Sequence, residues 1–179
     1  MYCGEEYYRA FINGDDRAFE KVVELYSDGL IFFINRYVHN LSEAEDIATD
    51  TFLYIVIHKN KFDFNYSLKT FLYTIGRSKA LTFLRKNKRN KANANIDNYV
   101  NIADEQDIEQ TVIKGEMKKM LYEAIAQLPE DMQNIVYLFY FENASYQEIS
   151  VITGKDQKQV DNLLYRAKKM LKVNMLKEV

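Results

Sequence analysis

Apolar side chains recur every three or four residues over most of this 179-residue chain. Such spacing places them on one face of an α-helix. Glycine occurs six times and proline once, which is too few for a turn-rich β-protein of this length. Because 47% of the residues are hydrophobic, the chain can bury a substantial core. We therefore predict an all-α protein.

The helical spacing is interrupted between Asn90 and about Gln110. This stretch, NKANANIDNYVNIADEQDIEQ, is rich in Asn and Asp and shows no sustained apolar period. A composition of this kind is typical of a flexible linker. We predict two small helical domains, over residues 1–91 and 112–179, joined by an acidic linker over residues 92–111.

Charge is sorted along the chain, although its formal net charge is only −2. Residues 1–60 hold five Lys and Arg against eleven Asp and Glu, whereas residues 61–95 hold nine against one. Five of those cations lie in FLRKNKRNK, residues 83–91. The sorting indicates two partners of opposite charge, with nucleic acid as the partner of the basic stretch. A basic helix end that is merely solvated is the alternative.

A helix is predicted to start at Asp15 or Asp16, and a second to open with a capping box formed by Ser42 and Glu45. In the second helix Ala44, Ile47, Ala48, Thr51 and Ile55 share the face that should be buried. The opposite face carries Asp46, Thr49, Asp50 and Leu53. Paired carboxylates beside an apolar residue are typical of a docking surface for a basic, partly apolar partner, and an ordinary solvated face is the alternative.

The aromatic and basic stretch from Asn60 is predicted to hold two short helices. Ser67 can cap the first, but continuing its apolar stripe would put Lys79 in the core. We therefore predict a break at Gly76–Ser78, where a permissive residue precedes a new cap. The aromatic residues Phe62, Phe64 and Tyr66 suit either a core or the stacking of bases.

A helix-turn-helix is predicted near the C-terminus. Ser145 and Glu148 have capping-box spacing, Gly154 suits a left-handed turn, and Asp156 with Gln159 opens the second helix. The second helix of such a unit enters the DNA major groove with its first outward residues. Candidates for reading base edges are Gln157, Lys158, Gln159, Asp161 and Asn162, and candidates for phosphate contacts are Arg166, Lys168 and Lys169. A helical hairpin without a DNA role is the alternative.

Taken together, these segments resemble bacterial RNA polymerase sigma factors of the extracytoplasmic-function type. GDDRAFEKVVELY and EAEDIATDTFLYI resemble the first half of the family's promoter-melting domain, and FLYTIGRSKALTFLRK resembles its helices that read the minus-ten element. LPEDMQNIVYLFYFENASYQEISVITG and VDNLLYRAKKML are similar to the domain that reads the minus-thirty-five element. The resemblance covers nearly the whole chain and departs from the family pattern at Phe71, Ser78 and Thr82.

The resemblance assigns a role to each surface. The face of Asp46, Thr49, Asp50 and Leu53 would bind the clamp coiled coil of core RNA polymerase. The melted non-template strand of promoter DNA would lie along Phe64, Tyr66, Tyr73, Arg77, Ser78 and Lys79, with a flipped base near the Gly76–Ser78 turn. Phosphates at the upstream duplex edge would meet Arg85, Lys86, Lys88 and Arg89. An anti-sigma factor is a further implied partner.

No phosphate-binding glycine loop and no metal-ligand spacing are present, so we expect neither catalysis nor a cofactor or metal. The N-terminus lacks the pattern of a signal peptide and Cys3 is the only cysteine, which predicts a cytoplasmic protein without membrane insertion. The rival interpretation is a stand-alone helix-turn-helix regulator whose first domain senses a ligand or dimerises. That interpretation leaves the acidic face, the basic stretch and the linker without a role.

Overall fold

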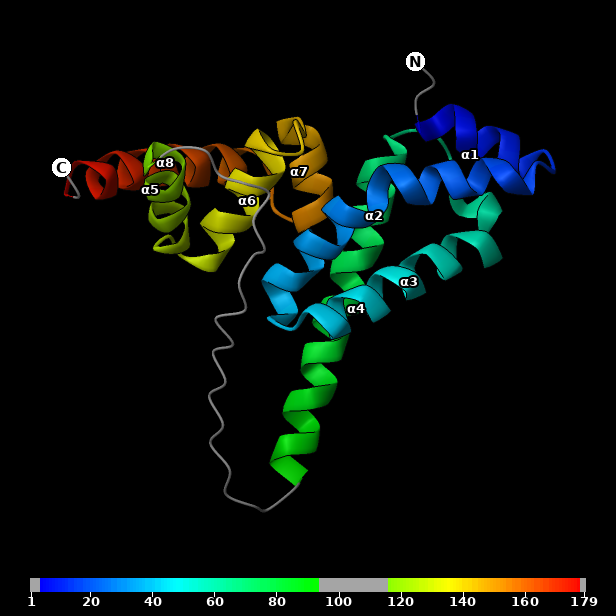
Figure 1. Ribbon diagram of the computed structural model, residues 1–179, viewed down its shortest axis with the longest axis horizontal. Coiled ribbons are helices and arrows are strands. Elements are labelled where there is room, and N and C mark those ends of the chain that lie inside the picture. The colour runs from blue at the N-terminus through cyan, green and yellow to red at the C-terminus, as the bar shows by residue number, and fades with distance from the viewer. Residues whose placement is uncertain (1–3, 94–115, 178–179) are drawn as a thin grey trace. The chain divides into compact units, whose positions relative to one another are not determined.

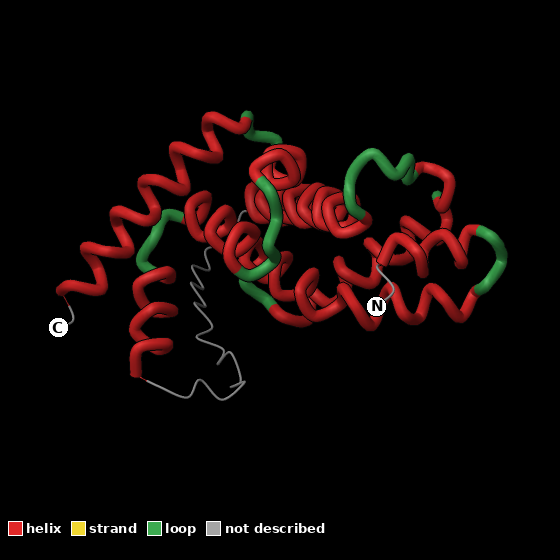
Figure 2. Tube along the Cα trace, turned by 90° about the horizontal axis from the view of Figure 1, so that it is seen from above, coloured by secondary structure: helices red, strands yellow, loops and turns green. Residues whose placement is uncertain are grey.

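The computed structural model describes residues 4–93 and 116–177, and every regular element in these two ranges is helical (Figures 1 and 2). The all-α prediction is confirmed. The chain divides into two compact units, Met1–Asp104 and Glu105–Val179. The predicted linker over residues 92–111 lies almost entirely outside the described residues. Among the described helices, none combines the length and apolar character that a bilayer crossing requires.

The first unit is built around α2, the long helix Asp16–Val38. Its partners are α1 (Gly4–Ile12), α3 (Leu41–Ile57) and α4 (Leu68–Asn93), and a 3-10 turn, η1 (Lys59–Lys61), follows α3. All three α-helices pack against α2, and α3 and α4 also pack against each other. The centre of this unit is filled by fully buried side chains, chiefly Tyr8, Leu30, Phe33, Ile34, Ile55, Leu68, Leu72 and Tyr73.

The predicted caps of this unit are partly right. Asp15 caps α2, because its carboxylate accepts a hydrogen bond from the amide of Arg17 at 3.1 Å. The predicted box of Ser42 and Glu45 is wrong, since α3 begins two residues earlier than that box requires. Its cap is Asn40, whose side chain accepts from the amide of Glu43 at 3.1 Å. Helix α1 was not predicted at all.

The predicted break at Gly76–Ser78 is also wrong, because α4 is continuous (Figure 1). A Cβ on Gly76 would lie 3.0 Å from Cδ1 of Leu30 and 3.2 Å from Cδ1 of Ile34. Glycine at this position therefore suits the close approach of α4 to α2, where a Cβ would force Leu30 and Ile34 to shift, and it makes no turn. Lys79 stays out of the core because its long aliphatic chain carries the amine to the protein surface, as is common for long cationic side chains.

The described residues of the second unit form four helices: α5 (Glu116–Ala126), α6 (Glu130–Tyr140), α7 (Tyr146–Thr153) and α8 (Gln157–Lys177). α5, α6 and α7 each pack on α8. Both sides of the capping box of Ser145 and Glu148 are present, and Gly154 takes the left-handed conformation with φ 69°. The predicted helix-turn-helix is thus formed by α7, residues 154–156 and α8. Pro129, expected at the first position of its helix, is instead the N-cap of α6, one position earlier.

Candidate protein and nucleic-acid interface

Four predicted docking residues line the solvent side of α3. Asp46, Thr49, Asp50 and Leu53 are all exposed, while the predicted opposite face of this helix is buried. Leu53 leaves 53% of its surface accessible, and Ile57, one turn further, leaves 65%. Sequence reasoning missed Ile57, although the four-residue step from Leu53 was a readable signal. We call Asp46, Thr49, Asp50, Leu53 and Ile57 the acidic stripe.

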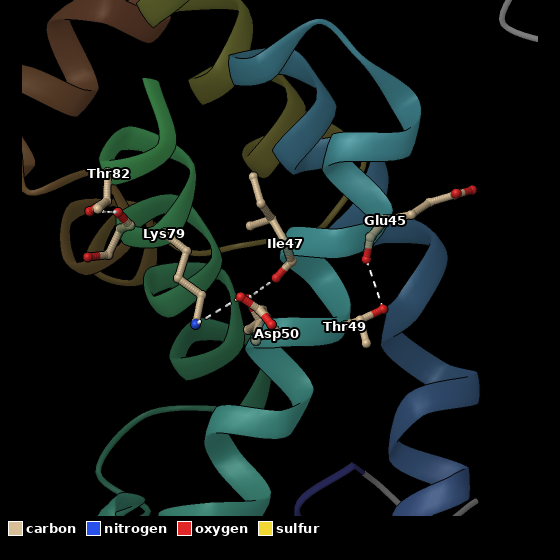
Figure 3. A network of polar contacts seen from close by, with 8 residues as sticks. Glu45, Ile47, Thr49, Asp50, Lys79 and Thr82 are labelled. Atoms are coloured by element: carbon tan, nitrogen blue, oxygen red, sulfur yellow. Dashed lines mark hydrogen bonds and ion pairs between the residues drawn. The ribbon is translucent and has the colours of Figure 1, made fainter. Parts of the chain in front are cut away.

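The acidic stripe touches the basic helix α4 at one point. Asp50 lies 3.8 Å from Nζ of Lys79, whereas the hydroxyl of Thr49 donates to the carbonyl of Glu45 at 2.9 Å (Figure 3). The Asp50 side chain is 68% exposed. A pair this long and this accessible to water contributes at most about 1 kcal/mol to stability. Asp50 therefore remains available to a stronger cationic partner.

The basic side chains of α4 occupy its C-terminal half. Figure 1 shows this half extending beyond the helices against which the rest of α4 packs. Arg85, Lys86, Lys88 and Arg89 are all exposed there. Consecutive cations on a projecting helix are suited to phosphate contacts, which are long-ranged and need no defined pocket.

The aromatic candidates divide into buried and accessible residues. Tyr73 is only 1% exposed and packs on Phe33 with ring centroids 5.0 Å apart, so its predicted contact with DNA is wrong. Phe62 is also part of the core, at 5% exposure. Tyr66 is exposed and Phe64 is half-buried, and both lie in the loop between η1 and α4. We call residues 62–67 the aromatic loop.

Three further minus-ten candidates lie on consecutive positions of α4. Ser78 is exposed, whereas Arg77 and Lys79 are half-buried. Nε of Arg77 is buried without a hydrogen-bond partner among the described residues. Because α4 is continuous here, these residues form no pocket at a turn, and the predicted base-capture turn at Gly76–Ser78 does not exist.

The recognition helix α8 presents all its predicted DNA-contacting residues to solvent. Gln157, Lys158, Gln159, Asp161, Asn162, Arg166, Lys168 and Lys169 are all exposed, while Val160, Leu164 and Ala167 are buried against the rest of the unit. Tyr165, 68% exposed, lies on the same outer face and was missed, although it follows Asp161 and Asn162 by four and three residues.

Two of these residues have a second role within the unit. The Oε1 of Gln159 accepts from the amide of Asp156 at 3.0 Å, and the carboxylate of Asp156 accepts from the amide of Gln159 at 2.7 Å. The predicted capping box is confirmed, and it occupies the oxygen that a bidentate base contact by Gln159 would need. The amine of Lys168 lies 5.8 Å from the ring centroid of Phe139.

A further apolar hollow in the second unit was not predicted. It encloses about 630 Å³ and is lined mainly by Leu121, Ile125, Val136, Tyr140, Phe141 and Leu171, with Lys168 and Lys172 completing the lining. Tyr140 and Phe141 remain 49% and 42% exposed. The sequence signal was an apolar helix that ends in two large aromatic residues. Exposed apolar surface of this kind commonly marks contact with another protein.

Comparison with known proteins agrees with this division. The family model described as "Sigma-70 region 2" matches residues 22–90, and "Sigma-70, region 4" matches residues 118–171. The first match covers α3 and most of α2 and α4, and the second covers the helix-turn-helix. The chain belongs to the sigma-70 family. This sigma factor therefore carries a region 2 match followed along the chain by a region 4 match.

Its relatives are extracytoplasmic-function sigma factors. This sigma factor is 27% identical over 167 residues to the ECF RNA polymerase sigma factor SigW of Bacillus subtilis, covering 89% of each chain. It is 25% identical over 166 residues to the RNA polymerase sigma-H factor of Pseudomonas aeruginosa, covering 88% of this chain and 86% of that protein.

Solved structures share the fold. The sigma factor RpoE of Bartonella quintana, solved in complex with the anti-sigma factor NepR, matches with a TM-score of 0.65 and 22% identity over 89% of this chain and 96% of that chain. CnrH, solved in complex with the cytosolic domain of CnrY, matches with a TM-score of 0.65 and 16% identity over 97% of each chain. Helix α1 lies before the first residue that the region 2 family model matches.

Proposed function

We propose that this sigma factor directs core RNA polymerase to its promoters through three separate surfaces. The acidic stripe docks on the polymerase, the aromatic loop and α4 hold the minus-ten element, and α8 reads the minus-thirty-five element. The observation that carries the proposal is that one unit exposes an acidic stripe and a basic helix end, and that the other unit exposes a recognition helix.

The acidic stripe suits a basic, partly apolar protein surface. Asp46 and Asp50 supply charge that steers association, while Leu53 and Ile57 supply apolar area that becomes buried on contact. The clamp coiled coil of core polymerase is the partner that the family resemblance implies. Lys79 would be released from Asp50 when a basic residue of the polymerase replaces it.

The minus-ten surface combines stacking with phosphate contacts. Phe64 and Tyr66 offer rings to unpaired bases, and stacking of one base contributes about 1–3 kcal/mol. Because α4 has no turn at Gly76, we place capture of a flipped base at the aromatic loop. Ser78 and Lys79 would follow the strand, and Arg85, Lys86, Lys88 and Arg89 would bind the phosphates of the adjoining duplex.

The minus-thirty-five surface is the outer face of α8. Asn162 is the strongest candidate for a bidentate base contact, since its side chain lies outside the capping box that engages Gln159. Gln157, Lys158 and Asp161 can reach further base edges, and Arg166, Lys168 and Lys169 the phosphates. In helix-turn-helix complexes, contacts to base edges read the sequence, and contacts to phosphates position the protein.

We assign no catalytic step to this sigma factor, since the phosphodiester chemistry belongs to the polymerase, and its place of action would be the cytoplasm, where the polymerase works. An anti-sigma factor is proposed as a further partner. The structurally similar sigma factor RpoE of Bartonella quintana was solved in complex with the anti-sigma factor NepR.

The deciding experiment is run-off transcription. Purified sigma factor is mixed with core RNA polymerase and promoter-containing DNA fragments. Specific transcripts that require the added chain are expected. A stand-alone helix-turn-helix regulator would instead bind duplex DNA without core polymerase and yield no transcript, and a pure interaction module would retain no DNA.

A further inference from the structure

Helix α1 fastens both ends of the connection between α3 and α4. Oε1 of Glu5 accepts a hydrogen bond from the amide of Leu68, the first residue of α4, at 2.7 Å. The hydroxyl of Tyr8 donates to the carbonyls of Ile55 and Lys59, at 3.1 and 3.2 Å, where α3 ends and η1 begins. A carboxylate at a helix N-terminus is favoured by the exposed amides and the helix dipole. Both ends of the connection between α3 and α4, which contains the aromatic loop, are thus attached to one helix.

The same face of α1 also contacts the middle of the aromatic loop. Cζ of Arg9 lies 3.8 Å from the centroid of the Phe64 ring, which is the distance of a stacked guanidinium. Glu5, Tyr8 and Arg9 follow the three- and four-residue steps that place side chains on one face of a helix. One turn of α1 therefore contacts the start, the middle and the end of this connection.

Phe64 has an unusual backbone that these contacts hold in place. Its φ is 60°, in the left-handed region that a bulky side chain rarely adopts. Such strained residues persist where surrounding contacts define them, and they gather at functional sites. The adjacent turn is closed by Asp63, whose carboxylate accepts from the amide and the side chain of Asn65 at 3.1 and 2.7 Å.

The pair of Arg9 and Phe64 differs from the core contacts around it. Tyr8 and Phe62 are buried, with ring centroids 5.6 Å apart, and serve the packing of the unit. Arg9 is exposed and Phe64 is half-buried, so their contact lies at the surface. Arginine commonly stacks its planar guanidinium on an aromatic face. The Phe64 ring also contacts Phe62, with ring centroids 4.4 Å apart, so Arg9 and Phe62 together hold this half-buried ring in one orientation at the position where we place base capture.

We propose that α1 is a positioning element for recognition of the minus-ten element, with Arg9 orienting Phe64 and with Glu5 and Tyr8 holding the ends of the aromatic loop. The proposal rests on the proposed function, because the orientation matters only if the aromatic loop contacts the melted strand. Arg9 is a positioning residue here, since it acts through Phe64. It lies outside the residues that the region 2 family model matches.

The test compares base preference at the minus-ten element between variants. Holoenzyme is reconstituted from core polymerase and the full chain carrying Arg9→Gln or, as a charge-matched control, Arg17→Gln. Arg17 is an exposed residue in the first turn of α2. A promoter is first selected with the unchanged holoenzyme. Each position of its minus-ten element is then changed in turn to each of the four bases, and run-off transcription is measured on every version.

Base preference is the ratio of transcription with the best base to transcription with the other three. For Arg9→Gln this ratio should fall about two- to fivefold at one position, because loss of an exposed cation–π contact has an effect of that size. Arg17→Gln should leave the ratio unchanged, and Arg9→Lys, which keeps the cation but loses the planar group, should fall between the two. Binding to core polymerase should be unchanged for all three variants. Arg9→Gln should lower the midpoint of thermal unfolding by a few degrees at most, as expected for one exposed contact.

Two results would overturn the proposal alone: a ratio equal to that of the unchanged protein, or an equal loss on all four bases, which would make Arg9 a phosphate contact. A different failure concerns the proposed function. If the unchanged holoenzyme yields no promoter-dependent transcript, the proposed function is wrong, and the role of α1 in base recognition is wrong with it.

Discussion

The two units of this sigma factor present their candidate DNA-binding residues in different ways. In the second unit the recognition helix is placed by local contacts: Ser145 with Glu148, Gly154 in its turn, and Asp156 with Gln159, all within a few residues in sequence. In the first unit the aromatic loop is held by Glu5 and Tyr8, which lie 63 and 47 residues from their partners Leu68 and Ile55. In the second unit, contacts between residues close in sequence are enough to position a helix. In the first unit, the position of the aromatic loop depends on how α1 packs against the rest of the unit.

This difference predicts that the second unit tolerates the loss of a reading residue more readily than the first. A residue on the outer face of α8 can change without disturbing the core beneath it. A change in the aromatic loop or along α4 is expected to alter stability together with function.

Reversing the charge of the acidic stripe should have the largest effect. Asp46→Lys combined with Asp50→Lys is expected to weaken binding to core polymerase at least about 100-fold, because truncating or opposing buried interfacial charges costs about 2–5 kcal/mol. Binding is measured by fluorescence anisotropy with labelled sigma factor.

The single variants Asp46→Lys and Glu45→Lys provide the control, since they make the same charge change on the same helix. Glu45 and Asp50 point to opposite sides of α3 in Figure 3. Only Asp46→Lys should weaken binding strongly. Equal effects of the two single variants would show that net charge, and not the acidic stripe, determines the affinity.

Removing base-reading side chains from α8 should separate specificity from stability. Asn162→Ala is expected to lose about 1–3 kcal/mol of discrimination at one promoter position while thermal unfolding stays the same. Gln159→Ala also removes half of a capping box, which lowers stability by about 0.5–2 kcal/mol. Selection of promoter fragments from a random library, together with calorimetry, measures both quantities. Uniform weakening on every sequence by Asn162→Ala would show that this residue contacts only the DNA backbone.

A substitution where α4 packs on α2 should change the stability of the first unit, although no DNA contact is proposed there. Gly76→Ala gains about 1 kcal/mol in helix propensity but must displace Leu30 and Ile34, which costs about 1–3 kcal/mol. We expect a net loss of stability of up to about 2 kcal/mol in chemical denaturation. A gain in stability would show that α2 and α4 can move apart without cost.

An alkaline titration gives the most specific effect, because it follows one side chain and is confined to high pH. Burial raises the pKa of Tyr8 to about 12 from the ordinary value of about 10. The unfolded chain therefore loses this proton first, and the stabilising contribution is complete below pH 10 and declines as the pH rises toward 12. Tyr8→Phe should show a shallower fall of unfolding free energy over this range. Identical slopes would show that Tyr8 ionises in the folded chain as it does in water.

The sequence was sufficient to predict those features that depend on neighbours along the chain. The helix-turn-helix, the buried face of α3 and the exposed cations of α4 follow from caps and from helical spacing, and the structure confirms them. Gly76 and Tyr73 were predicted wrongly because their environments are set by Leu30, Ile34 and Phe33 on another helix. No local pattern reveals such a contact. Helix α1 was missed for a related reason, since its stability depends on contacts with α2 and α4.

The site residues divide in the same way. Ile57 and Tyr165 were within reach of the sequence, because each continues an exposed face already predicted. The contact of Arg9 with Phe64 was not, since it joins residues 55 positions apart and depends on the left-handed backbone of Phe64. Long-range contacts of this kind determine how far each of several similar rings is buried.

The central claim is that one chain uses an acidic stripe to bind core RNA polymerase and two other surfaces to bind promoter DNA. Its most direct test is size-exclusion chromatography of the purified chain mixed with core polymerase at micromolar concentration and low salt, with no inhibitor present. We predict that the two migrate as one complex and that Asp46→Lys with Asp50→Lys separates them. Independent migration of the unchanged chain and the polymerase would contradict the account.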